Sequence, residues 1–162
     1  MTQFANTPGI PKEDADKLFA AGVSFLSNKA FSSAYVCFDR IPAKDFKLLY
    51  NKALCCFMVE WYDECHRLLC EAERLVPMNA GHGTERLPEA FIHYLHDEES
   101  PFCPMPQGTP EPLAYTRILR LKAEAACKQH LYGELKAISF RLGGKYKHIE
   151  TLINTSCNND DQ

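Results

Sequence analysis

The stretch that decides the fold class, residues 49–77, reads LYNKALCCFMVEWYDECHRLLCEAERLVP. It contains two runs of apolar and small residues at helical spacing, separated by a short turn near Glu60. The second run stops at Pro77, because proline cannot continue the hydrogen-bond ladder of a helix. Small residues such as Ala53 and Cys65 let two antiparallel helices approach closely. The stretch therefore predicts a helical hairpin.

The spacing of large, small and aromatic residues in this hairpin resembles the tetratricopeptide repeat, a unit of about 34 residues. The positions that carry the resemblance are Leu49, Ala53, Cys56, Cys65, Leu69, Ala72 and Pro77, with Asn51 and Tyr62 also typical of the family. Cys56 stands where the family usually has Tyr. The resemblance implies an all-α fold, a right-handed α-solenoid of antiparallel helix pairs that ends in a C-terminal capping helix.

Two further copies of the pattern flank this one. Residues 14–46 show the same spacing about 31 residues before the copy at 47–78, and residues 115–144 show it about two periods after that copy. Ser139 weakens the third copy, since a large apolar residue belongs there. The expected organisation is a leader (1–13), one tetratricopeptide-repeat domain (14–153) that includes a capping helix (145–153), and a polar tail (154–162).

An insertion, residues 79–112, separates the second and third copies. Its many prolines and glycines break any long helix. One short helix is expected from Pro88 to about Asp97, and the stretch from Ser100 to Pro112 is expected to be extended. A compact domain seldom carries so long a loop without a use for it.

Charge and hydropathy exclude several classes of partner. The chain has 18 Lys and Arg against 21 Asp and Glu, a net charge of -3, so no basic field favours nucleic acid. No apolar run is long enough to span a bilayer, and the N-terminus shows no signal peptide. We therefore expect a cytoplasmic protein that contacts neither nucleic acid nor membrane.

The 8 cysteines would fit a disulfide framework in a secreted protein. However, most of them fall inside the helical patterns, several at positions that require a small buried side chain. Free cysteine packs as a small hydrophobe. Without an export signal, reduced packing thiols in a reducing cytoplasm are the favoured interpretation.

The resemblance implies a concave groove that binds a peptide or an amphipathic helix of a partner protein. Carried over position by position, its residues are Phe19, Val23, Leu26, Tyr50, Asn51, Leu54, Phe57, Met58, Arg117 and Arg120. Most form an apolar wall, beside which the two arginines are cationic anchors. The alternative occupant is the insertion itself, with Phe91, Ile92, Tyr94 and Leu95 lying in the groove, because apolar surface is seldom left open.

No motif predicts catalysis or a cofactor: the chain lacks a P-loop, a GxGxxG turn and a GxSxG elbow. His66 and Cys70 lie one helical turn apart, but without CxxC or HExxH pairing we expect no metal site. The sequence favours a non-enzymatic interaction module or scaffold. The alternatives are a self-assembling homo-oligomer, a small chaperone of secretion-substrate type, and a redox or metal sensor that uses Cys103, His93 and His96.

Overall fold

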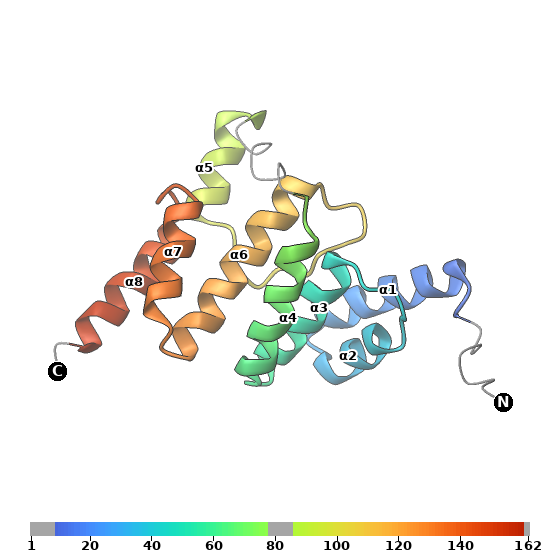
Figure 1. Ribbon diagram of the computed structural model, residues 1–162. Coiled ribbons are helices and arrows are strands. Elements are labelled where there is room, and N and C mark those ends of the chain that lie inside the picture. Colours follow the sequence, from blue (N-terminus) through green and yellow to red (C-terminus); the bar gives the residue numbers. More distant parts are fainter. Residues whose placement is uncertain (1–8, 78–85, 161–162) are drawn as a thin grey trace.

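The computed structural model describes residues 9–77 and 86–160, with side chains described as far as Ser156. These residues form eight α-helices and no β-strand, which confirms the all-α prediction (Figure 1). The helices are α1 (Lys12–Ser27), α2 (Phe31–Asp39), α3 (Phe46–Met58), α4 (Tyr62–Leu75), α5 (Glu89–Asp97), α6 (Glu111–Lys128), α7 (Tyr132–Arg141) and α8 (Lys147–Asp160). Residues 1–8, 78–85 and 161–162, which hold most of the expected leader, the start of the insertion and the end of the tail, lie outside the described residues.

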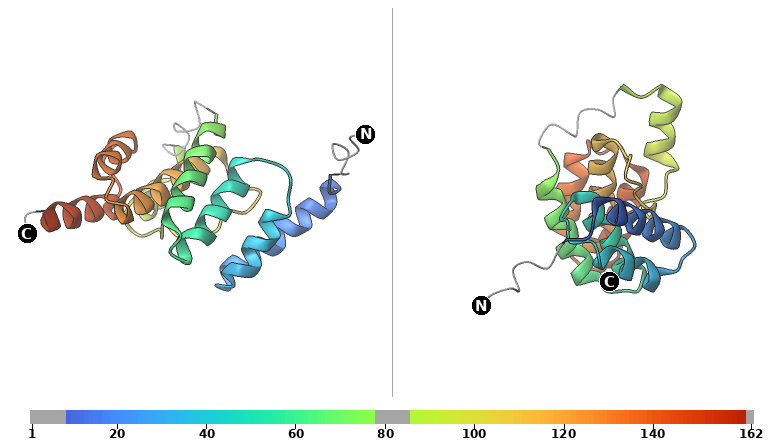
Figure 2. Two further views of the ribbon diagram at one scale, coloured as in Figure 1. Left: turned by 60° about the horizontal axis from the view of Figure 1, so that its bottom comes forward. Right: turned by 90° about the vertical axis from the view of Figure 1, so that its right-hand side faces the viewer.

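The helices pack in a row, each against the next, except that α4 packs directly on α6 (Figures 1 and 2). The short helix α5 lies outside this row and contacts α8. It occupies the position predicted from Pro88 to Asp97. The inserted residues therefore leave the row of helices continuous.

The turns inside the pairs α1/α2, α3/α4 and α6/α7 share one backbone geometry. In each turn a single non-glycine residue has a left-handed conformation, at Lys29 (φ 61°), Glu60 (φ 66°) and His130 (φ 60°). The amide that follows donates to a carbonyl five residues earlier, Ala30 to Phe25, Trp61 to Cys56 and Leu131 to Ala126, at 2.8 Å in every case. These hydrogen bonds satisfy carbonyls that the end of a helix leaves without partners. The three turns recur at the offsets expected for the repeats.

At Gly22, helix α1 packs directly against the Phe38 ring of α2. A Cβ atom there would lie 2.5 Å from Cε1 of Phe38, a separation that side chains essentially never show. Glycine is thus required by the packing of the aromatic ring. Phe38 in turn meets the ring of Phe19 edge to face, with 5.6 Å between centroids.

Helix α6 lies at the centre of the molecule and separates two apolar clusters. Ile118 and Leu121 face the cluster built mainly by α1–α4, whereas Leu119 and Ala123 face the one shared with α5, α7 and α8. Because the helix is covered on all sides, even charged residues along it are buried. These buried charged residues of α6 contribute to the sites described below.

Helix α8 extends to Asp160. The capping helix was predicted to end at Ile153. Side-chain hydroxyls of Thr151, Thr155 and Ser156 bond back to carbonyls one turn earlier, at 2.8–2.9 Å. Polar composition alone gave no reason to expect this extension. None of the helices in the described residues is long and apolar enough to cross a membrane.

Candidate functional site

Residues 99–107, here called the inserted segment, lie without regular secondary structure along α3 and α6 (Figure 1). We call the surface that contacts them the α3/α6 face. It is formed by Lys47, Tyr50, Asn51 and Phe57 of α3 and by Arg117 and Arg120 of α6. The capping carboxylate of Asp45 fixes the start of α3 by accepting from the Lys47 and Leu48 amides, at 2.7 and 3.0 Å.

Asn51 holds the main chain of the inserted segment at one residue. Its Nδ2 donates to the Met105 carbonyl, and its Oδ1 accepts from the Met105 amide, both at 2.8 Å. Both residues are fully buried. A carboxamide is suited to this task because it offers a donor and an acceptor side by side. The pair recognises a peptide backbone and makes no use of the Met105 side chain.

Further side chains of the α3/α6 face donate to carbonyls of the same segment. The hydroxyl of Tyr50 bonds the Cys103 carbonyl at 2.7 Å, and Nη1 of Arg117 bonds the Pro104 carbonyl at 3.1 Å. In the same way, Nη2 of Arg120 bonds the Glu99 carbonyl at 2.5 Å, and Nζ of Lys47 bonds the Gln107 carbonyl. With Met105, five main-chain carbonyls of the segment are held by side chains. The face is therefore built around the main chain of the inserted segment.

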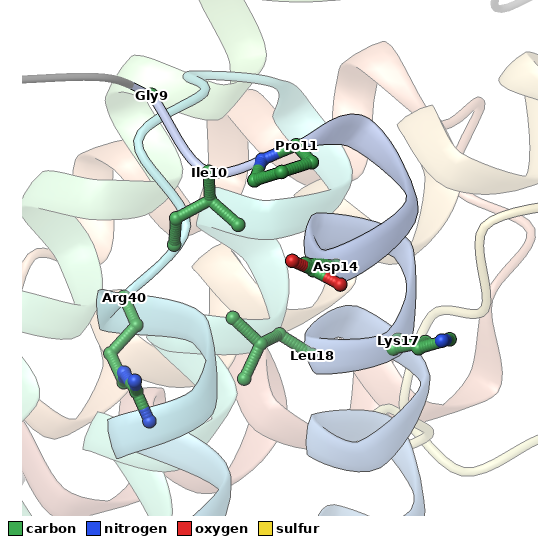
Figure 3. Close-up of a pocket in the computed structure, with 7 residues that line it drawn as sticks. All are labelled: Gly9, Ile10, Pro11, Asp14, Lys17, Leu18 and Arg40. Carbon is green, nitrogen blue, oxygen red and sulfur yellow. The ribbon is translucent and has the colours of Figure 1, made fainter.

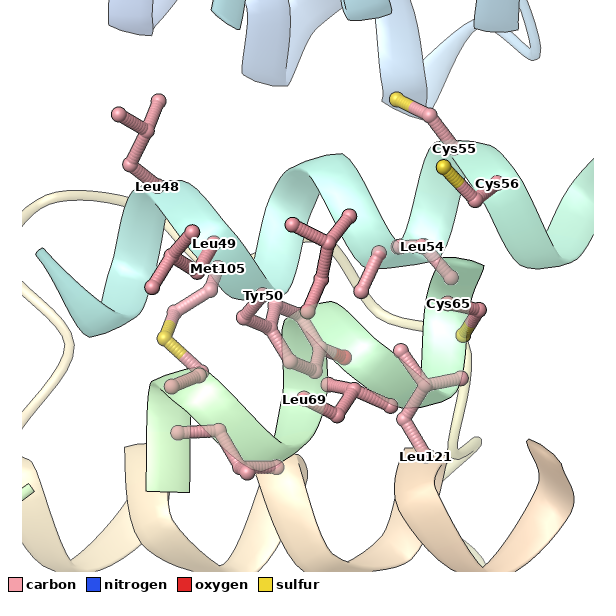
Figure 4. Packing of buried hydrophobic residues seen from close by; sticks show 14 of the residues in the cluster. Leu48, Leu49, Tyr50, Leu54, Cys55, Cys56, Cys65, Leu69, Met105 and Leu121 are labelled. Atoms are coloured by element: carbon pink, nitrogen blue, oxygen red, sulfur yellow. The ribbon is translucent and has the colours of Figure 1, made fainter. Parts of the chain in front are cut away.

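Two apolar side chains of the segment are also accommodated. Met105 is completely buried beside Leu49 (Figure 4). The ring of Phe102 packs on that of Phe57, with centroids 5.1 Å apart. These contacts add apolar burial to the hydrogen bonds, and burial is the main favourable contribution in such an interface.

The two arginines give the face its charge. Arg117 and Arg120 lie 3.7 and 3.6 Å from the Glu99 carboxylate. Arg120 is only 1% exposed, and burial lowers its pKa despite the carboxylate beside it. Nε and Nη1 of Arg120 have no hydrogen-bond partner among the described residues, and neither has Oε2 of Glu99. The inserted segment thus leaves part of this guanidinium unsatisfied.

Burial also determines the state of Tyr50. It raises the pKa of the hydroxyl far above its ordinary value, more than the neighbouring Arg117 lowers it. The phenol consequently stays protonated and remains a hydrogen-bond donor at physiological pH. Its role on the face is to bind a carbonyl.

The structure brings together five of the residues assigned to a groove from the sequence: Tyr50, Asn51, Phe57, Arg117 and Arg120. It places the other five elsewhere or beneath the surface. Phe19, Leu26 and Leu54 are buried core residues, Val23 is partly buried against the same core, and Met58 is exposed at the end of α3. Phe19 is buried because its ring packs edge to face on Phe38 of α2.

The occupant also differs from the one expected. Phe91 and Tyr94 of α5 are 63% and 54% exposed and do not fill the α3/α6 face. The non-helical residues that follow α5 fill it. A chain without helical hydrogen bonds leaves its carbonyls free for Asn51 and the arginines, whereas a helix uses them internally. Sequence reasoning predicted this stretch to be extended, but missed Lys47, Phe102 and Met105 as contact residues.

Two hollows lie away from this face. One of about 660 Å³ is bordered by Gly9, Ile10, Leu18 and Arg40 near the first described residues (Figure 3). A smaller one, about 280 Å³, lies between α2 and the end of α3 and is lined largely by apolar side chains such as Tyr35, Val36 and Trp61. The larger hollow also has the charged side chains of Asp14, Lys17 and Arg40 on its border (Figure 3), whereas none of the described charged side chains lines the smaller one.

Comparisons of the chain with protein-family models, with curated proteins and with solved structures gave no match.

Proposed function

We propose that this chain is a tetratricopeptide-type α-solenoid and a non-enzymatic interaction module, whose α3/α6 face binds an extended peptide of a partner protein. In this proposal the inserted segment is an occupant supplied by the chain itself. The solenoid assignment is supported by the three turns of equal geometry at the repeat offsets. Repeat proteins of this kind mainly form binding surfaces.

The observation that carries the proposal is the double hydrogen bond between Asn51 and Met105. Because both bonds go to the main chain, a foreign extended peptide can form them equally well. The remaining donors of the face also bind carbonyls. A face of this design selects first for an extended conformation and only then for side chains.

The inserted segment indicates the chemistry of the partner. It presents the Glu99 carboxylate to two arginines, the Phe102 ring to Phe57, and the Met105 side chain to a buried site. A partner peptide is therefore expected to carry an acidic, an aromatic and a long apolar residue at the same spacing. The partner's acidic residue replaces Glu99 beside the arginines.

Displacement of the inserted segment is favoured by the incomplete satisfaction of Arg120. A buried donor without a partner costs about 1–3 kcal/mol, and a closer carboxylate would recover part of this. Competition from an occupant in the same chain lowers the apparent affinity for a partner, since the tethered segment has a high effective concentration. A binding assay must therefore use a variant in which the inserted segment no longer occupies the α3/α6 face.

The test uses a fluorescent peptide with the sequence of residues 98–108, EESPFCPMPQG, and a full-length Phe102→Gly/Met105→Gly variant whose own segment is weakened. We expect the peptide to bind this variant and to bind the wild type much less. Adding Asn51→Ala to the variant should abolish binding. Adding Asn28→Ala instead should not, because Asn28 is an exposed residue at the C-terminal end of α1. The proposal would be refuted if the Phe102→Gly/Met105→Gly variant were folded and did not bind the peptide.

Self-assembly is a second candidate, favoured by exposed apolar side chains around the smaller hollow. Val36 and Val59 are each 56% exposed and Trp61 is 48% exposed. Sedimentation of the wild type and of a Val59→Glu/Trp61→Glu variant tests it, because a dimer formed there should dissociate in the variant. A small chaperone of secretion-substrate type would be a special case of the first proposal, with the partner as its client.

A further inference from the structure

Three side chains with metal-binding atoms meet where α4 passes α7. His66 and Cys70 lie one turn apart on α4, and Glu134 lies in the first turn of α7. One ligand atom from each falls within 4.8 Å of the others. All three side chains are partly buried, with His66 20% and Glu134 28% exposed, so an ion can reach them from solvent.

The separations fit the coordination shell of a small divalent cation. Nε2 of His66 lies 2.9 Å from either carboxylate oxygen of Glu134 and 3.9 Å from Sγ of Cys70. Around a tetrahedral zinc ion, the ordinary bond lengths put N and O about 3.3 Å apart and N and S about 3.6 Å apart. We propose that His66, Cys70 and Glu134 form a Zn²⁺ site that joins α4 to α7, with its fourth position open to water.

The mixed donor set selects the metal. A thiolate and an imidazole favour zinc or another borderline transition-metal ion over Mg²⁺ or Ca²⁺, which prefer oxygen ligands. Binding replaces the His66–Glu134 hydrogen bond with two bonds to the metal, with the imidazole proton on Nδ1. The Cys70 thiol loses its proton to solvent as the Zn–S bond forms, so one proton is released for each ion bound.

Lys122 is the one cation that contacts the ligand set in the described residues. Its Nζ lies 3.1 Å from Oε1 of Glu134 and 2.7 Å from Oε2 of Glu73. Glu73 also pairs with Arg141. Since Lys122 is shared between two carboxylates and approaches Oε1, the second oxygen of Glu134 is left for the metal. The ammonium then acts as an outer partner that orients the carboxylate.

The same three residues could also be compared with a catalytic triad, in which Cys70 would be the thiol nucleophile, His66 the base and Glu134 the carboxylate that orients it. Sγ of Cys70 lies 3.7 Å from Nδ1 of His66. That chemistry also requires donors for the oxyanion of an acyl intermediate. Cys70 lies in the interior of α4 (Tyr62–Leu75), where main-chain amides are used by the helix itself. The geometry consequently favours a metal over acyl transfer.

Cobalt provides the test, because Co²⁺ replaces zinc and reports its ligands by absorption. Titration of the reduced full-length protein should give intense visible bands of a tetrahedral site and a near-ultraviolet thiolate-to-cobalt band, at one ion per chain. Cys70→Ser should lose the thiolate band. Glu134→Gln should keep it but bind at least about tenfold more weakly, since one ligand loses its charge.

Cys37→Ser, which removes another partly buried thiol, is the matched control and should bind cobalt like the wild type. Circular dichroism shows whether each variant is folded. At one Zn²⁺ concentration, the ion should also raise the Tm of the wild type more than that of Glu134→Gln, because the variant binds it more weakly. The proposal is overturned if micromolar cobalt gives no thiolate band, or if folded Cys70→Ser gives the wild-type spectrum.

Discussion

Asn51 and Met105 are 54 positions apart in the chain and exchange two hydrogen bonds of 2.8 Å. A side chain that satisfies both main-chain groups of one residue fixes the register of the inserted segment on α3. With Met105 held, Phe102 meets Phe57 and Glu99 meets the two arginines. One polar pair thus sets which residues of the segment reach each part of the α3/α6 face.

Asn51→Ala should release the inserted segment while leaving the helices folded. The change leaves the buried amide and carbonyl of Met105 without partners, a loss of about 2–3 kcal/mol. Hydrogen exchange measured by mass spectrometry should show faster exchange across residues 99–107. Asn28→Ala is the control, because the side-chain amide of Asn28 donates to the Ser24 carbonyl of α1 and does not contact the inserted segment. Unchanged protection of the segment in Asn51→Ala would show that Asn51 does not set its register.

Gly22→Ala should destabilise the α1/α2 pair by about 1–3 kcal/mol through overpacking, because its Cβ would meet the Phe38 ring. Urea unfolding gives the change in free energy. At the equivalent positions of the second helix pair the residues are Ala53 and Leu69, both fully buried. Phe38→Leu should therefore relieve part of the overpacking caused by Gly22→Ala. The double variant should lose less unfolding free energy than the two single variants lose together. Strict additivity would contradict the contact.

The free energy of unfolding should depend on Glu73 in a pH-dependent way. Burial opposes ionisation of this carboxyl, but hydrogen bonds from Lys122 and Arg141 outweigh it and lower its pKa. A lowered pKa stabilises the fold above the unfolded value, about 4.3, and this stabilisation is lost as pH falls through the folded pKa. Glu73→Gln should cost about 1–3 kcal/mol at pH 7, and the loss should be smaller at pH 3, which lies below the unfolded pKa.

Urea unfolding at both pH values measures this difference. Glu13→Gln is the control, because the Glu13 side chain is 81% exposed in its pair with Lys17. Its free energy of unfolding should follow the wild type at each pH. An equal loss for Glu73→Gln at pH 3 and pH 7 would mean that packing of the side chain, and not its charge, is responsible.

Three thiols of the α3/α4 pair should resist alkylation in the folded protein. Burial raises the pKa of Cys55 to about 12 and that of Cys56 to about 11, and it raises the pKa of Cys65 as well. Because only the thiolate reacts, iodoacetamide at pH 8 should leave these three unmodified until urea is added. Peptide mapping by mass spectrometry should find Cys37, which is partly exposed, modified first.

Modification of Cys55 or Cys56 as rapid as that of Cys37 would mean that the α3/α4 pair opens readily. The same experiment bears on the expectation of reduced packing thiols. The structure records seven free cysteines in its described residues, three of them buried.

The positions of the helices and of the turns between them could be predicted from local sequence patterns. Local spacing specifies which face of a helix is apolar, and short turns of fixed offset follow from it, so the hairpin at 49–77 and its counterparts could be recognised. The candidate residues on α3 and α6 were carried over from the repeat family that the hairpin resembles. These properties depend on residues close together in the chain, where periodicity carries the information.

Only the tertiary structure decided what covers Asn51 and which residues meet across the helices. The inserted segment has no period, and its register depends on a few side-chain bonds between distant positions, such as that of Asn51 to Met105. The approach of Glu134 to His66 and Cys70 likewise depends on the angle at which α7 passes α4. Pairings of this kind are set by the packing of whole helices, which no local pattern specifies.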